Sequence, residues 1–371
     1  ISGNIDIDGT TNLDIVDIDG AANFAADVTI ATGADLLTAS AGTDNVRIGL
    51  DAGDSIASGG LRNILIGRNA GTAITTGDSN IAIGWEALKT EDANGNNVAI
   101  GASALATQNA GADAYNVGIG YNAGLSVTTG GNNTLIGGLS GDALTTGAGN
   151  VSVGTSSLSA SQTGNNGTAV GYGALAATTT SDNTGIGYLA GQAVTTGIQN
   201  TLIGANAGDA LTDADANVAV GRAALTTDTL GSQSVAIGSR ALNSQNFTTA
   251  TNSYNTAVGA DAGLSVTTGI QNTLIGGLAG DALTDADFNV ALGYSALGAA
   301  TTSDGNTAIG RFALLSDTQG NLSVAVGRDA LRAQNMGSDI DSYNTAVGGL
   351  AGTALTTGLY NTLIGGLAGD A

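Results

Sequence analysis

Apolar residues recur along this chain in one short phrase instead of in long runs. The phrase Asn-x-x-(Ile/Val/Leu)-Gly occurs nineteen times, with Gly or Ser replacing Asn in three copies. The residue before the closing glycine is always Ile, Val or Leu, and Val, Ile or Thr stands two positions earlier. Because strand side chains alternate between faces, the phrase predicts a very short β-strand. We expect its two outer residues to face the core and the residue between them, most often Ala or Leu, to face the other way.

The closing glycines follow one another at 17 residues in most steps, with 16, 18 or 19 occasionally and 21 twice. A fixed period of this size indicates one small unit stacked many times. A helical repeat is disfavoured because every unit is rich in Gly, Thr and Asn, whereas Glu and Lys are rare. We therefore predict an all-β fold, a parallel β-solenoid or β-roll with coils of about 17 residues. Eighteen steps of about 4.8 Å would give a stack of roughly 86 Å.

Two further positions of the unit follow strict rules. Three residues after the closing glycine stands Ala in seventeen copies and Ser in two, which predicts that another backbone passes close by. The next residue is either Gly or Leu, and the two kinds come in blocks. We interpret the two kinds of unit as two ways of filling one buried slot in the core. In a Leu unit the Leu itself fills the slot, and in every complete Gly unit an apolar residue three positions later fills it. These residues are Ile56, Ile74, Val127, Leu144, Val194, Leu211, Val266, Leu283 and Leu355.

The first part of the chain follows another pattern. Residues 1–44 lack the 17-residue phrase and alternate apolar with acidic residues, as in Ile5-Asp6-Ile7-Asp8, which is typical of half-buried strands. We predict a β-rich stalk or lead-in module over residues 1–44 and a nineteen-coil shaft over residues 45–371. Since the chain begins and ends inside patterned sequence, we expect it to continue beyond both ends.

Composition excludes most chemistry. The chain has no His and no Cys, so zinc sites, Ser-His and Cys-His nucleophile systems and disulfides are excluded. The net charge of −22 disfavours nucleic acid as a partner. The chain contains no apolar run long enough to span a membrane. Only two glutamates are present and the aspartates lie in repetitive turns, which disfavours a glycosidase. We expect no enzyme activity and no cofactor.

Acid pairs in the turns raise the question of calcium. The segments "TDADAN" (residues 212–217) and "TDADFN" (residues 284–289) could offer oxygen ligands to Ca²⁺. They match neither the EF-hand pattern nor the Gly-rich nonapeptide of calcium β-rolls. We interpret them as solvated turns and predict no metal site. Ice binding is disfavoured as well, because adjacent Thr residues of "TTG" point to opposite faces.

The irregular loops are the candidate recognition sites. The longest cover residues 243–254 and 332–343, and a shorter relative ends at Tyr115. Loops on a rigid scaffold often carry binding residues. The side chains that could stack on a surface glycan are Phe247, Tyr254, Met336, Tyr343 and Tyr115. The alternative interpretation is that each Tyr before Asn only covers the end of a coil.

The segments "NTAVGADAGLSVTTGIQNTLIGGLAGDALT" (residues 255–284) and "SVAIGSRAL" (residues 234–242) resemble two related groups. One is the head repeats of trimeric autotransporter adhesins, whose β-rolls use an NSVAIG-like phrase. The other is the fibre and tail-fibre proteins of bacteriophages, which the opening stretch "NIDIDGTTNLDIVDIDGAANF" (residues 4–24) resembles more. The repeat is longer than the usual autotransporter coil, and no neck or membrane-anchor segment is present.

A thin coil with an apolar Ala/Leu strip on its outside would need a partner along its whole length. Self-association of parallel copies is the simplest solution, and the resemblance implies a homotrimer. The leading hypothesis is an extracellular structural fibre, the shaft of a phage tail fibre that projects a host-binding element. Its partners would be copies of itself, other virion or fibre proteins, and a host glycan or protein. The second hypothesis is a bacterial surface adhesin whose repeat surface binds partners directly.

Overall fold

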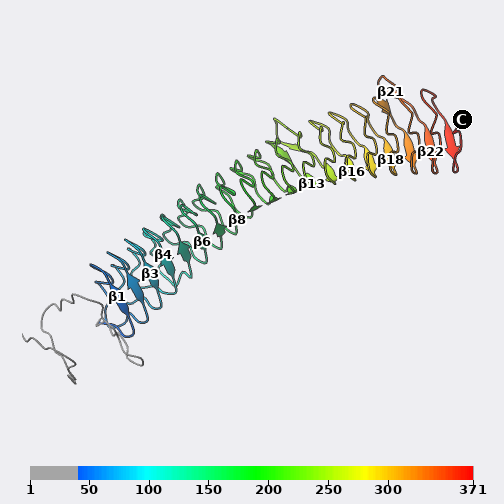
Figure 1. Ribbon diagram of the computed structural model, residues 1–371. Helices are drawn as coiled ribbons and strands as arrows, with labels where there is room; N and C mark the ends of the chain where they lie inside the picture. The colour runs from blue at the N-terminus through cyan, green and yellow to red at the C-terminus, as the bar shows by residue number, and fades with distance from the viewer. Residues whose placement is uncertain (1–40, 371) are drawn as a thin grey trace, which may run out of the picture. The chain divides into compact units, whose positions relative to one another are not determined.

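The computed structural model describes residues 41–370, which contain twenty-three strands and no helix. The described coils belong to the second of two compact units, Ala39–Ala371. The predicted lead-in module at residues 1–44 lies almost entirely outside the described residues. Figure 1 shows the coils stacked one after another in chain order from β1 to β23.

The strands are two or three residues long. They are β1 (Val46–Ile48), β2 (Ile64–Ile66), β3 (Ile81–Ile83), β4 (Val98–Ile100), β5 (Val117–Ile119), β6 (Thr134–Ile136), β7 (Val151–Val153), β8 (Thr168–Val170), β9 (Thr184–Ile186), β10 (Thr201–Ile203), β11 (Val218–Val220), β12 (Gly231–Ser232), β13 (Val235–Ile237), β14 (Thr251–Asn252), β15 (Thr256–Val258), β16 (Thr273–Ile275), β17 (Val290–Leu292), β18 (Thr307–Ile309), β19 (Gly320–Asn321), β20 (Val324–Val326), β21 (Ile340–Asp341), β22 (Thr345–Val347) and β23 (Thr362–Ile364).

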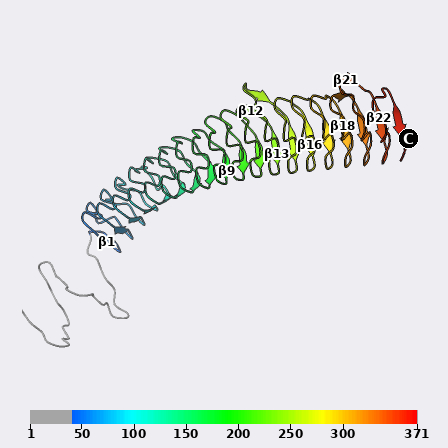
Figure 2. The same cartoon turned by 45° about the horizontal axis from the view of Figure 1, so that its top comes forward.

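Nineteen of these strands form one parallel sheet, in which each strand pairs in register with the strand of the next coil. Between β6 and β7, for example, Thr134 lies opposite Val151 and Ile136 opposite Val153. Two short parallel sheets, β12–β14 and β19–β21, are separate from it and lie on the opposite side of the coils (Figure 2). The predicted all-β parallel solenoid with coils of about 17 residues is confirmed.

Each strand ends at its closing glycine because coils approach one another most closely there. Gly137 has a φ of 131°, and a Cβ on it would lie 2.6 Å from the carbonyl oxygen of Gly154 in the next coil. The same contact recurs from coil to coil, so a side chain at this position would push the stack apart. The glycine therefore permits close stacking as well as the turn.

The predicted direction of the strand side chains is wrong. The middle residue of the strand lies in the core, as Leu65, Leu135 and Ala169 show, and all three are fully buried. The first and third residues point outward and are half-buried or exposed. The interior of a 17-residue coil is narrow, so it accepts one strand side chain, the small residue and the slot residue. The two β-branched residues have no room inside.

The buried slot filled from two chain positions is confirmed. In Gly units, a Cβ on Gly71 would lie 2.7 Å from Cδ2 of Leu65 and 2.8 Å from Cδ1 of Ile74. The Leu side chain of a Leu unit fills the corresponding space directly, as with the fully buried Leu105. The neighbouring strand adjusts to it: a Cβ on Gly118 would lie only 2.7 Å from Cγ of Leu105. Core volume is thus matched between coils.

The recurring Asn forms a buried ladder along the stack. Oδ1 of Asn133 accepts the backbone N–H of Asn150 at 3.0 Å, and Nδ2 of Asn133 donates to the carbonyl of Gly147 at 3.0 Å. The same two bonds recur in most coils, so each Asn satisfies backbone groups on both sides of it. Asn stands two positions before the middle strand residue, so its burial places that residue inside as well.

Candidate functional surfaces

The outer face of the long sheet is an apolar strip. We define the outer strip as the first and third residues of the nineteen strands of this sheet. Nine of these positions hold Thr, the others hold Val, Ile or Leu, and none is charged. Ile275 is 36% exposed and Leu292 is 45% exposed. The side chains on a sheet face that is directed to water are normally polar. An apolar face such as this one therefore indicates a surface that a partner covers.

Large side chains border the outer strip on both sides. We call the residue before the ladder position the leading edge and the residue after the closing glycine the trailing edge. All eight tyrosines of the chain and its single Trp are edge residues. The exposed aromatic residues are Tyr115, Tyr254, Phe288, Tyr343 and Tyr360 on the leading edge, and Trp85, Tyr121, Tyr172, Tyr188 and Tyr294 on the trailing edge.

The structure does not bring the predicted recognition residues together. Tyr115, Tyr254 and Tyr343 are about half exposed, but they lie on the leading edge of three separate coils. Tyr343 stacks on Tyr360 of the following coil, with ring centroids 5.5 Å apart and planes 13° from parallel. Its hydroxyl donates to Oδ2 of Asp341 at 3.2 Å. That bond, together with the negative charge of Asp341, raises the pKa of the Tyr343 hydroxyl.

Phe247 is not a surface residue, and its predicted role in recognition is wrong. The side chain is 5% exposed because the long loop folds back on the preceding coil, where β14 pairs with β12. A Cβ on Gly231 would lie 2.7 Å from Cδ2 of Phe247, which shows how closely the ring packs. Met336 takes the equivalent place over Gly320 in the second long loop and is half-buried.

Under the long loops lie buried carboxylates that the sequence interpretation missed. Oδ1 of Asp228 accepts the backbone N–H groups of Gly231 and Phe247, both at 3.0 Å. Its Oδ2 accepts Nε2 of Gln245 at 2.6 Å, and Oε1 of Gln245 accepts Nδ2 of Asn255 at 2.9 Å. We call this chain from acid to Gln to ladder Asn a polar relay.

The polar relay recurs before the second 21-residue coil and before the 19-residue coil. Asp317 bonds to Gln334, whose Oε1 accepts Nδ2 of Asn344 at 2.9 Å. Oε2 of Glu91 accepts Nε2 of Gln108 at 2.8 Å in the shorter relative. The sequence did contain a sign of these relays. The residue three positions after the Leu of a Leu unit is buried, and the acids and glutamines of the relays all stand at this position. These relays anchor the loops and, being buried, offer no access to a substrate.

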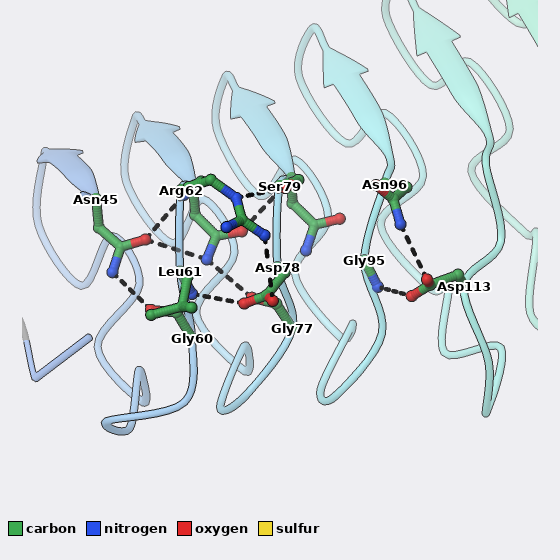
Figure 3. A network of polar contacts seen from close by, with 12 residues as sticks. Asn45, Gly60, Leu61, Arg62, Gly77, Asp78, Ser79, Gly95, Asn96 and Asp113 are labelled. Atoms are coloured by element: carbon green, nitrogen blue, oxygen red, sulfur yellow. Dashed lines mark hydrogen bonds and ion pairs between the residues drawn. The ribbon is translucent and has the colours of Figure 1, made fainter. Parts of the chain in front are cut away.

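The turn acids bond to neighbouring coils, as Figure 3 shows for the first coils. Oδ1 of Asp78 accepts the backbone N–H of Leu61 at 2.7 Å, and Oδ1 of Asp113 accepts that of Gly95 at 2.8 Å. In the "TDADAN" turn, Oδ1 of Asp215 accepts the N–H of Ile198 at 2.8 Å. These carboxylates therefore cap exposed backbone groups.

Asp287, in the "TDADFN" turn, is the most crowded of these acids. Its Oδ1 accepts the N–H of Ile270 at 2.7 Å, and its own N–H donates to Oδ1 of Asp304 at 2.7 Å. Burial raises the pKa of the Asp287 carboxyl, the Ile270 bond lowers it, and the charges of Asp304 and Asp285 raise it further. Within residues 41–370, no three acids lie close enough together to hold a metal ion.

Comparison of the sequence with protein-family models gives no match, and comparison with curated protein sequences gives none either. No helix suited to crossing a membrane occurs in the described part of the chain.

Proposed function

We propose that the coil stack is the shaft of a structural fibre, assembled from three identical parallel chains. The fibre lies outside the cell on a virion, as part of a bacteriophage tail fibre, and holds a host-binding element away from the particle. Its work is mechanical, so the proposal includes no reaction and no cofactor.

The outer strip is the observation that carries this proposal. Eighteen steps of about 4.8 Å and a three-residue width of about 10 Å give roughly 860 Å². One partner contributes about 800 Å² to a typical stable protein interface; in a trimer each chain divides its strip between two neighbours, so the bordering edge residues must add to the contact. The three-fold number comes from the resemblance to trimeric β-roll repeats.

The structure of each coil suits a load-bearing role. Every coil is tied to the next by strand pairing, most also by the Asn ladder and some by a turn carboxylate, so pulling along the stack would strain many short-range bonds at once. Repeat proteins of this type gain stability from neighbour-to-neighbour contacts, which permits a long shaft without one large core.

The alternative is a bacterial surface adhesin whose repeat surface binds partners directly. The exposed aromatic edge residues are the side chains that would do so. They border the outer strip, so side-by-side assembly of chains would cover much of them. This geometry favours the shaft over the adhesin.

Immunogold electron microscopy tests the proposal, with antibodies raised against the purified coil stack. On particles and cells of the source, we expect the label along fibres that project from virions. Label on the surface of uninfected cells would support the adhesin instead. Label confined to the interior of cells would contradict both.

A further inference from the structure

The trailing edge carries glycines that the chain itself does not need. A Cβ on Gly349 or on Gly138 would meet no atom within 4 Å, and neither residue has a positive φ. Glycine in an ordered segment is less favourable than Ala by about 0.5–1 kcal/mol. Packing within one chain therefore gives no reason for glycine at these two positions.

The opposite edge of the same coils supplies a reason. The leading-edge residue paired with Gly349 is Tyr343, and the one paired with Gly138 is Asn132. Gly366 likewise has Tyr360 across the outer strip. In no coil do both edges carry Gly or Ala, although four coils carry large residues at both edges. The closest contacts are therefore expected where a glycine faces a ring.

Symmetry decides which edges can meet. When parallel copies are related by rotation about the stack axis, the leading edge of one chain meets the trailing edge of the next, at the same coil. In an antiparallel pair, like edges would meet, and Tyr343 would face another leading edge. The parallel, in-register arrangement places Tyr343 opposite Gly349 of the partner subunit and Tyr360 opposite Gly366 of the partner subunit.

We propose that neighbouring chains meet along these edges, with Tyr343 and Tyr360 seated against Gly349 of the partner subunit and Gly366 of the partner subunit. The two stacked rings form one continuous aromatic surface, and the Tyr343 hydroxyl is held by Asp341. This pairing deepens the proposed function and rests on it, because the chains must associate for the edges to meet. It specifies that the fibre is parallel and in register.

An exchange of the two residues tests the pairing. Gly349→Tyr should keep the monomer fold, because nothing in the chain lies within 4 Å of the new Cβ, and should raise the concentration for half-assembly about tenfold or more. The double variant Tyr343→Gly with Gly349→Tyr exchanges the two residues, so that a ring again faces a glycine across the interface. It should assemble about as well as the wild type. Ala250→Tyr, on an exposed loop away from the strip, is the matched control and should change nothing.

Sedimentation across a concentration series measures assembly, and circular dichroism confirms the fold of each variant. The pairing is overturned if Gly349→Tyr assembles like the wild type, or if the double variant assembles no better than the single one. If the wild-type chain itself stays monomeric, the proposed fibre fails and the pairing fails with it. If the wild type assembles but the exchange does not rescue, only the edge pairing is lost.

Discussion

The core volume rule makes a sharp prediction at Gly118, the middle residue of β5. A Cβ there would lie 2.7 Å from Cγ of Leu105 and 3.2 Å from the carbonyl oxygen of Ala123. Gly118→Ala should therefore overpack the core, which typically destabilises by about 1–3 kcal/mol. Removing a glycine from a strand offsets about 0.5–1 kcal/mol of that loss. We expect a net local destabilisation of about 0.5–2 kcal/mol.

The partner substitution completes a cycle. Leu105→Ala alone should destabilise by about 2–5 kcal/mol, because it leaves a cavity in the slot. In the double variant, the new methyl group occupies part of the space that Leu105 leaves. Its destabilisation should therefore be smaller than the sum of the two single effects by about 1 kcal/mol, a coupling typical of residues in contact.

Hydrogen exchange is the suitable assay, because a long repeat stack need not unfold in one step. The N–H of Leu105, which donates to the carbonyl of Ala123 at 2.9 Å, reports on this coil. Its exchange should be about 2- to 30-fold faster in Gly118→Ala, from the tenfold per 1.4 kcal/mol relation. Gly138→Ala, whose Cβ meets nothing, is the control and should not speed exchange. Unchanged exchange in Gly118→Ala, or strictly additive effects, would refute the rule.

Three further predictions concern polar groups. Asp228→Ala should destabilise the first long loop by about 2–5 kcal/mol, because three buried N–H donors lose their acceptor. Proteolysis within residues 243–254 should then be faster than in the wild type. Resistance equal to that of the wild type would contradict the relay. Asn133→Ala should lower the local stability of its coil by about 2–4 kcal/mol, measured by hydrogen exchange at the Asn150 N–H. Unchanged protection of this N–H would count against the ladder. A raised carboxyl pKa favours the folded state below the ordinary pKa, and this advantage is lost as pH rises through the raised value. Asp287→Asn should therefore raise the melting temperature at pH 7 more than at about pH 4, and a larger gain at acidic pH would contradict the assignment.

The sequence predicted the coil, its period and the filled slot, because these depend on glycine and on side-chain volume at fixed spacing. It did not predict which strand face is buried, since the outer residues of a strand such as Thr134–Ile136 and its middle Leu135 are all compatible with a core. The decisive side chain was Asn133, which shares a face with Leu135 and bonds to the next coil. An apolar strip was expected outside the coil and is present, but it is formed by the other set of residues.

The candidate site was harder to predict because its key contacts join residues about 17 positions apart. Asp228 and Gln245 have no local pattern, and their pairing appears only when coils are stacked. Phe247 was assigned to the surface from its place in a long loop, but the polar relay below draws that loop back over the preceding coil. Loop length alone therefore does not predict exposure in a stacked coil.

The central claim is that identical chains associate through the outer strip. Sedimentation equilibrium of the purified chain tests it most directly, beside the variant Ile275→Asp, whose side chain points outward and lies within the strip, away from its ends. We predict a mass of about 107 kDa for the wild type, three times the 35.7 kDa of one chain, and weaker assembly of a normally folded variant. A wild-type mass of 35.7 kDa at micromolar concentration would contradict the account.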